Sequence, residues 1–185
     1  MMKTLITVLL TLALVLLLVE GYVYSGAFDV AADRPHGAFV QWLVQTTRER
    51  SIAARAKDIK VPPLDAPTLI AQGAGEYAEM CAGCHLAPGV QDNEFRQGLY
   101  PPAPELAKGG GAGAEPAQQF WIVKHGIKMS AMPAWGVTHD DATIWSIVAF
   151  LQKLPTLTPE QYTALTNDSE SAHDEHDHTH AGDEQ

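Results

Sequence analysis

The segment Cys81-Ala82-Gly83-Cys84-His85 contains the two cysteines of this 185-residue chain. Two thiols three positions apart, about one helical turn, can add to the two vinyl groups on one edge of a haem. The histidine that follows is then carried beneath the ring, where its imidazole reaches the iron. The pattern therefore predicts one covalently attached haem c, bound through Cys81 and Cys84, with His85 as an axial ligand of the iron.

Two other interpretations of the cysteine pair are weaker. A redox-active C-x-x-C pair is expected beside a strand–helix–strand unit, and the chain shows no strand–helix alternation. A structural zinc site needs a second pair of ligands at standard spacing, which is missing here. The pattern favours covalent haem over both.

Composition excludes several classes of protein. Lys and Arg total 12 against 22 Asp and Glu, a net charge of −10, which argues against nucleic acid as a partner because phosphate binding requires a concentrated basic face. With 46% hydrophobic and 18% charged residues, most of the chain should fold. No glycine-rich phosphate-binding motif is present.

Shifts in charge and hydropathy divide the chain into five segments. Residues 26–61 hold six basic and four acidic side chains, whereas residues 168–185 hold seven acids and no Lys or Arg. The expected segments are a transmembrane anchor or signal peptide (1–25), a helical connecting segment with a basic stretch (26–63), the main domain (64–157), a short helix (158–166) and a disordered acidic tail rich in His (167–185).

The N-terminal segment predicts export. After Lys3, the residues from Leu5 to Val19 are apolar apart from two threonines, and the apolar character extends to Tyr24 with one Glu. This length suits a retained membrane helix, which we favour, or a signal peptide cleaved near Ala27. In both cases Lys3 stays in the cytoplasm and the rest of the chain is exported.

Helical patterns predict an all-α protein. Asp33 and Pro35 start a helix that runs to Lys60; we expect it to dock on the main domain, with a basic amphipathic helix on the membrane surface as the alternative. Further helices are predicted from Pro116 to Gly126 and from a Thr138-x-x-Asp141 start to Pro155. The Gly- and Pro-rich stretch between the cysteine motif and Pro116 should be loops.

The flanks of the motif resemble the class I cytochrome c family from about Thr68 to Pro155. Gly73 and Tyr77 stand at the family's spacing before the motif, where a glycine lets the last helix cross closely. The residues that look like the family's packing face on that helix are Trp145, Val148, Phe150 and Leu151. The resemblance implies a small all-α domain wrapped around the haem and preceded here by the N-terminal membrane helix.

The resemblance also implies a sixth iron ligand. The segment from Gly126 to Gly136 is similar to the family's ligand loop, which carries Met-Pro, and this favours Met132. The alternatives are Met129, His125, His139 and an open iron position. By the same resemblance, the carbonyl of Pro88 would accept a hydrogen bond from the axial histidine. Four residues are candidates to line the haem or to contact its propionates: Tyr100, Trp121, Trp135 and Arg96. Side chains of these types more commonly serve in core packing or as solvated charges.

The C-terminal tail contains four histidines between His173 and His180 among acidic residues. A solvating acidic tail is the favoured interpretation, and weak binding of copper, zinc or nickel is the alternative, because imidazole and carboxylate groups suit these ions.

These features together predict an electron-transfer protein rather than an enzyme. A His/Met-ligated haem cycles between Fe(III) and Fe(II) with no vacant position for bond chemistry, and we find no nucleophile–base constellation. Expected partners are a redox donor and acceptor, in a redox chain on the periplasmic side of a bacterial membrane. Alternatives are a haem-bearing subunit of an oxidase or dehydrogenase complex, and a haem enzyme or gas sensor with a displaceable ligand.

Overall fold

The computed structural model describes residues 1–109 and 115–167, which contain helices and no strand. This confirms the predicted all-α class. The chain divides into two compact units, Met1–Pro35 and His36–Gln185. The four histidines of the acidic tail lie outside the described residues.

The first unit consists of helix α1, Met2–Tyr24, and the segment that follows it. Every residue of α1 is exposed, and its composition is apolar around the whole circumference. At 1.5 Å per residue the helix is about 35 Å long, enough to cross a hydrocarbon layer of roughly 30 Å. Its length and composition are those of a membrane span, and an export signal meets the same test.

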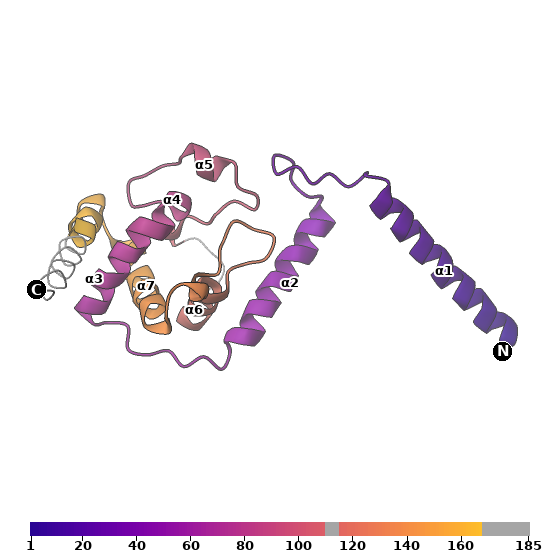
Figure 1. Ribbon diagram of the computed structural model, residues 1–185, viewed down its shortest axis with the longest axis horizontal. Helices are drawn as coiled ribbons and strands as arrows, with labels where there is room; N and C mark the ends of the chain where they lie inside the picture. The colour runs from indigo at the N-terminus through magenta and orange to yellow at the C-terminus, as the bar shows by residue number, and fades with distance from the viewer. Residues whose placement is uncertain (110–114, 168–185) are drawn as a thin grey trace, which may run out of the picture. The chain divides into compact units, whose positions relative to one another are not determined.

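The second unit is a helical domain joined by long loops (Figure 1). Its α-helices are α2 (Ala38–Ala56), α3 (Pro67–Glu76), α4 (Ala82–His85), α5 (Glu94–Gln97), α6 (Pro116–His125) and α7 (Asp141–Lys153). A π-helical turn, η1 (Tyr77–Cys81), links α3 to α4, and the short 3₁₀ turns are η2 (Leu106–Lys108), η3 (Trp135–Val137) and η4 (Leu154–Thr156). Residues 159–167 are helical.

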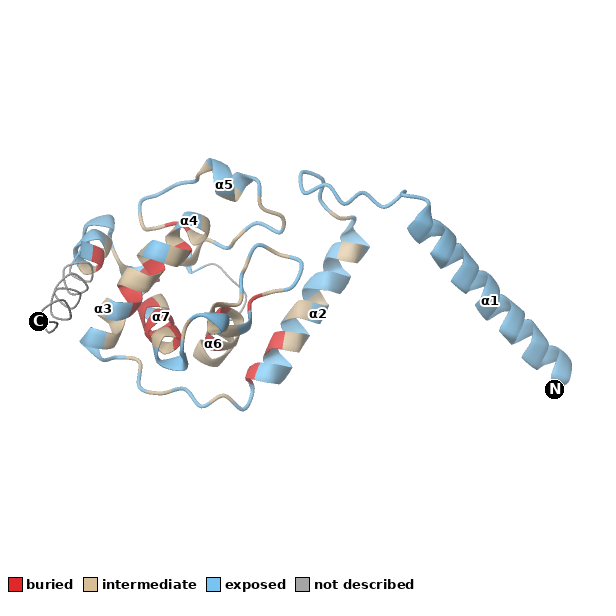
Figure 2. Cartoon of the chain, in the orientation of Figure 1, coloured by how far each residue is buried: buried red, intermediate tan, exposed pale blue. Residues whose placement is uncertain are grey.

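The crossing of α3 and α7 forms the centre of the domain, and Figure 2 shows buried residues concentrated on α7. A Cβ at Gly73 would lie 1.9 Å from the backbone oxygen of Ser146, so only glycine permits this approach. The close crossing confirms the role predicted for Gly73. Beside it, the Tyr77 and Phe150 rings pack with centroids 5.3 Å apart, and both side chains are fully buried.

A second apolar cluster joins α6 to α7. Phe120 and Val123 of α6 pack against Ile144, Ile147 and Val148 of α7. Helix α6 runs from Pro116 to His125 and is capped by Gly126, as predicted. Its junction with the next loop is close, because Gly126 lies against the backbone of residues 132 and 133.

Two helix starts differ from the sequence expectations. Helix α2 begins at Ala38, after Gly37, and not at the predicted Asp33–Pro35 start. Helix α7 is capped by Asp140, whose carboxylate accepts a hydrogen bond from the Thr143 amide at 2.8 Å. The predicted cap, Thr138, instead donates to the carbonyl of Trp135. Asp140 is the stronger cap because it lies immediately before the first helical residue and carries a charge that suits the positive end of the helix.

Helix α2 docks on the domain through its C-terminal half. Ile52 and Ala56 are buried, and α2 contacts α6. Phe39 and Trp42, near the other end of α2, are exposed. The docked helix is the arrangement that the periodic pattern favoured.

Candidate functional site

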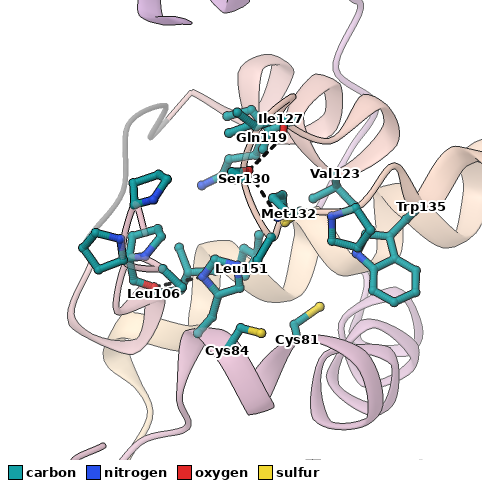
Figure 3. A pocket seen from close by; sticks show the side chains of 18 of the residues that line it. Cys81, Cys84, Leu106, Gln119, Val123, Ile127, Ser130, Met132, Trp135 and Leu151 are labelled. Atoms are coloured by element: carbon teal, nitrogen blue, oxygen red, sulfur yellow. Dashed lines mark hydrogen bonds between the residues drawn. The ribbon is translucent and has the colours of Figure 1, made fainter. Parts of the chain in front are cut away.

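A cavity of about 410 Å³ lies between α2, the α4 region, the loops after it, α6 and α7. Its volume falls within the roughly 300–1,000 Å³ usual for ligand sites. Cys81, Cys84, His85 and Met132, the four predicted site residues, all line it. In Figure 3 the side chains of the two cysteines and of Met132 approach the cavity from different elements.

The cysteines are presented by the helical segment that follows α3. The π-helical turn η1 ends at Cys81, and α4 carries Cys84 and His85. The two cysteines are not joined in a disulfide, and burial raises the pKa of Cys81 to about 12. Cys81 is therefore a neutral thiol at neutral pH, which suits a position in an apolar cavity.

The ring of His85 is oriented by a hydrogen bond. Its Nδ1 lies 2.9 Å from the carbonyl oxygen of Pro104. A carbonyl can only accept, so Nδ1 carries the proton and Nε2 keeps a free lone pair. Burial lowers the pKa of His85, partly opposed by the hydrogen bond to Pro104 and assisted by the charge of Arg96, so the imidazole is favoured in the neutral form that can bind a metal.

The carbonyl partner of His85 is a correction to the sequence expectation. Pro88, proposed by resemblance, does not line the cavity, whereas Pro104 does. The loop before Pro104 is held in place because the Arg96 guanidinium donates to the carbonyl of Ala103 at 2.9 Å. Arg96 therefore supports the loop that orients His85, and it does not line the cavity itself.

Of the two methionines in the predicted ligand loop, only Met132 reaches the cavity. Met129 is 99% exposed and adopts a positive φ of 58°. The Met132 amide donates to Ser130 Oγ at 3.2 Å, and that hydroxyl donates to the carbonyl of Ile127 at 2.8 Å (Figure 3). A further bond, from the Ile127 amide to the Met132 carbonyl, closes the loop at 3.1 Å.

Most of the other candidates for iron ligand or cavity lining lie away from the cavity. His125 and His139 do not line the cavity; the Nδ1 of His139 is near the Thr138 hydroxyl, at 2.8 Å. Of the aromatic candidates only Trp135 is a lining residue, whereas Tyr100 and Trp121 are not.

The lining residues that the sequence analysis did not assign to the site include Arg48 and Ile52 of α2. With Ala56 they follow one another at four-residue spacing and so share one face of the helix. That spacing was the available signal. The spacing indicates that this face of α2 packs against the domain, but it does not indicate that the face borders a cavity.

The residues present fit a covalently bound haem. The lining is mainly apolar, and it brings together two thiols, a neutral imidazole with a free Nε2 and a thioether, which are the donor types of a His/Met-ligated haem c. Within the described ranges, no group of three or more His, Cys, Asp or Glu side chains suggests a separate metal centre.

Residues 68–151 match the family model described as cytochrome C oxidase, cbb3-type, subunit III. No curated protein and no solved structure matches the chain. The matched range contains all four predicted site residues and begins after α1 and α2, so the N-terminal third of the chain lies outside it.

Proposed function

We propose that residues 68–151, which match the cytochrome family model, form a class I c-type cytochrome domain that binds haem c covalently, and that this chain is a one-electron carrier in which His85 and Met132 would hold the iron. The observation that carries the proposal is the convergence of Cys81, Cys84, His85 and Met132 on one mainly apolar cavity. The chain has a single C-x-x-C-H motif, so we propose one haem.

Each of the four side chains has a separate task in this proposal. Cys81 and Cys84 hold the group by two thioether bonds. His85 offers Nε2 as the fifth ligand, and its hydrogen bond to Pro104 fixes the tautomer and increases the donor strength of the ring. Met132 offers a neutral, soft sulfur as the sixth ligand, which favours a higher reduction potential than a second imidazole.

The apolar side chains in the remaining lining would limit the access of water to the bound group. Bound haem supplies an iron that cycles between Fe(III) and Fe(II). The buried Ile52 and Val123 and the partly buried Leu151 would limit water around the group, which would favour the less charged, reduced state. If His85 and Met132 both hold the iron, no ligand position would be left for a substrate, and the protein would only gain and lose an electron.

A second candidate is a haem-bearing subunit of a membrane oxidase or dehydrogenase complex. The matching family is described as an oxidase subunit, which favours this assignment. It shares the same electron-transfer chemistry and differs in its partners. Purification in mild detergent separates the two, because a subunit would co-purify with its complex and a free carrier would not.

We also propose that the cytochrome domain is periplasmic. Helix α1 would either anchor it to the bacterial cytoplasmic membrane, with Lys3 inside, or be removed as a signal peptide. A retained anchor predicts sedimentation with membranes and a soluble, spectrally unchanged protein when the chain begins at Ala27. A mature N-terminus near Ala27 in mass spectrometry would establish cleavage instead.

The experiment that tests the proposed function is an absorption spectrum of oxidised and reduced protein with a redox titration. A carrier with His/Met ligation should show a reversible one-electron transition and, in the ferric state, the weak near-infrared band of sulfur bound to iron. Absence of that band together with ready binding of carbon monoxide would favour a haem enzyme or sensor.

A further inference from the structure

We propose that α2, which precedes the matched cytochrome segment, is part of the haem pocket, and that Arg48 on this helix pairs with a carboxylate of the haem. The inference rests on the proposed function, because it assumes that the cavity holds haem. It assigns a binding role to a helix that the family match does not include.

Arg48 is the unusual member of the cavity lining. Among the described residues that line it, Arg48 is the only Lys, Arg, Asp or Glu side chain, in surroundings otherwise dominated by apolar groups. Two glutamines of the lining, Gln119 and Gln152, hydrogen-bond to each other. A permanent cation in such a place needs an anionic partner.

Within the described protein the guanidinium of Arg48 has a loose ion pair with Glu49 and no hydrogen bond to an anionic group. Its Nε is buried and makes no hydrogen bond. One terminal nitrogen lies 3.8 Å from the carboxylate of Glu49, beyond hydrogen-bond distance, and both side chains of this pair are partly exposed. Leaving a buried donor unsatisfied costs about 1–3 kcal/mol, and more when the donor is charged.

Haem would provide the missing acceptor. The ring carries two propionate groups, and an arginine fork matches the geometry of a carboxylate in a paired hydrogen bond. Arg48 is held at the cavity because Ile52, one turn further along α2, is buried in the same lining and α2 contacts α6.

The reduction potential of the holoprotein tests the pairing. Arg48→Gln removes a positive charge beside the group that accepts the electron, so the oxidised state should gain about tenfold over the reduced state, about 59 mV for one electron. Arg48→Lys keeps the charge and should retain most of the potential. The matched control is Arg50→Gln, because Arg50 is exposed on the same helix and does not line the cavity; it should shift the equilibrium less than twofold.

Nuclear magnetic resonance of the reduced wild-type protein provides a direct check that needs no variant. The Nε proton of Arg48 should show contacts to the propionate methylene protons. Equal reduction potentials for Arg48→Gln and Arg50→Gln would overturn the inference, and so would the absence of this contact in the wild-type protein. Both results would leave the carrier function intact. Protein without haem would overturn both, and haem staining of denaturing gels distinguishes these outcomes.

Discussion

Gly126→Ala should loosen the loop that carries Met132. This glycine caps α6 and lies against the backbone of Met132 and Pro133. Its backbone, φ 63° and ψ −170°, belongs to a region that only glycine occupies readily. An added Cβ would also lie 2.6 Å from the carbonyl carbon of Pro133 and 2.7 Å from the carbonyl oxygen of Met132. The substitution therefore combines backbone strain with a clash against the residue proposed to bind iron.

The expected loss in the free energy of unfolding is the sum of the backbone strain and the steric clash. The strained backbone costs about 1–3 kcal/mol, and overpacking a tight contact costs about 1–3 kcal/mol more. A total of about 2–6 kcal/mol is large beside the roughly 5–15 kcal/mol that stabilises a typical protein. Movement of residues 132 and 133 to relieve the clash should also weaken the bond between the Met132 sulfur and iron.

Gly109→Ala is the comparison variant: Gly109, which lines the cavity, also has a positive φ, 72°, but no heavy atom of the described residues lies within 4 Å of the added Cβ. It should show only backbone strain, about 1–2 kcal/mol. Urea unfolding gives both stabilities, and the ferric near-infrared band reports the sulfur ligand. Equal stability of the two variants, with the band unchanged in Gly126→Ala, would refute the argument that close contact at Gly126 positions Met132.

Tyr77→Phe removes the hydrogen bond to the Leu86 carbonyl, 2.6 Å long, and should lower the free energy of unfolding by about 1–3 kcal/mol. Burial raises the pKa of Tyr77 above its ordinary 10, so the native state retains a proton that the unfolded state releases; this stability is complete below about pH 10 and falls by about 1.4 kcal/mol per unit above it. Urea unfolding at neutral and alkaline pH should show a weaker alkaline loss in the Phe variant, and an identical loss would exclude Tyr77 as its source. Met132→Ala should lower the potential and admit carbon monoxide or cyanide, whereas Met129→Ala should leave ligation unchanged; the reverse result would make Met129 the ligand. Deleting residues 167–185 should leave the haem spectrum intact, and calorimetry with copper should give equal heats before and after deletion if the tail only solvates, or a lost, pH-sensitive signal if its histidines bind metal.

The attachment motif could be recognised from sequence because its chemistry is local. Two thiols and an imidazole must follow one another within five residues, so their proximity in the fold is evident from the sequence alone. Gly73 was also predictable, by resemblance, and its contact with Ser146 gives the physical reason. The helices were readable where apolar periodicity and end signals coincide, as from Pro116 to Gly126.

Contacts made by loops could not be predicted in the same way. The carbonyl that orients His85 comes from Pro104, 19 residues away in a Gly- and Pro-rich stretch without periodicity. Nothing in the sequence of that stretch indicates which carbonyl faces the His85 ring, and the resemblance to the family pointed to Pro88 instead. Arg48 illustrates the same limit for a helix, since its spacing from Ile52 shows a shared face but not the cavity opposite.

The central claim is that Cys81 and Cys84 bind haem covalently, and mass spectrometry of the denatured protein tests it most directly. The account predicts that the peptide containing residues 81–85 carries the mass of haem. Each single cysteine-to-alanine variant should retain at most a weakened attachment through the other thiol, and the double variant should carry none. Covalent haem on the double variant, or none on the wild-type protein produced with an intact haem-attachment system, would contradict the account.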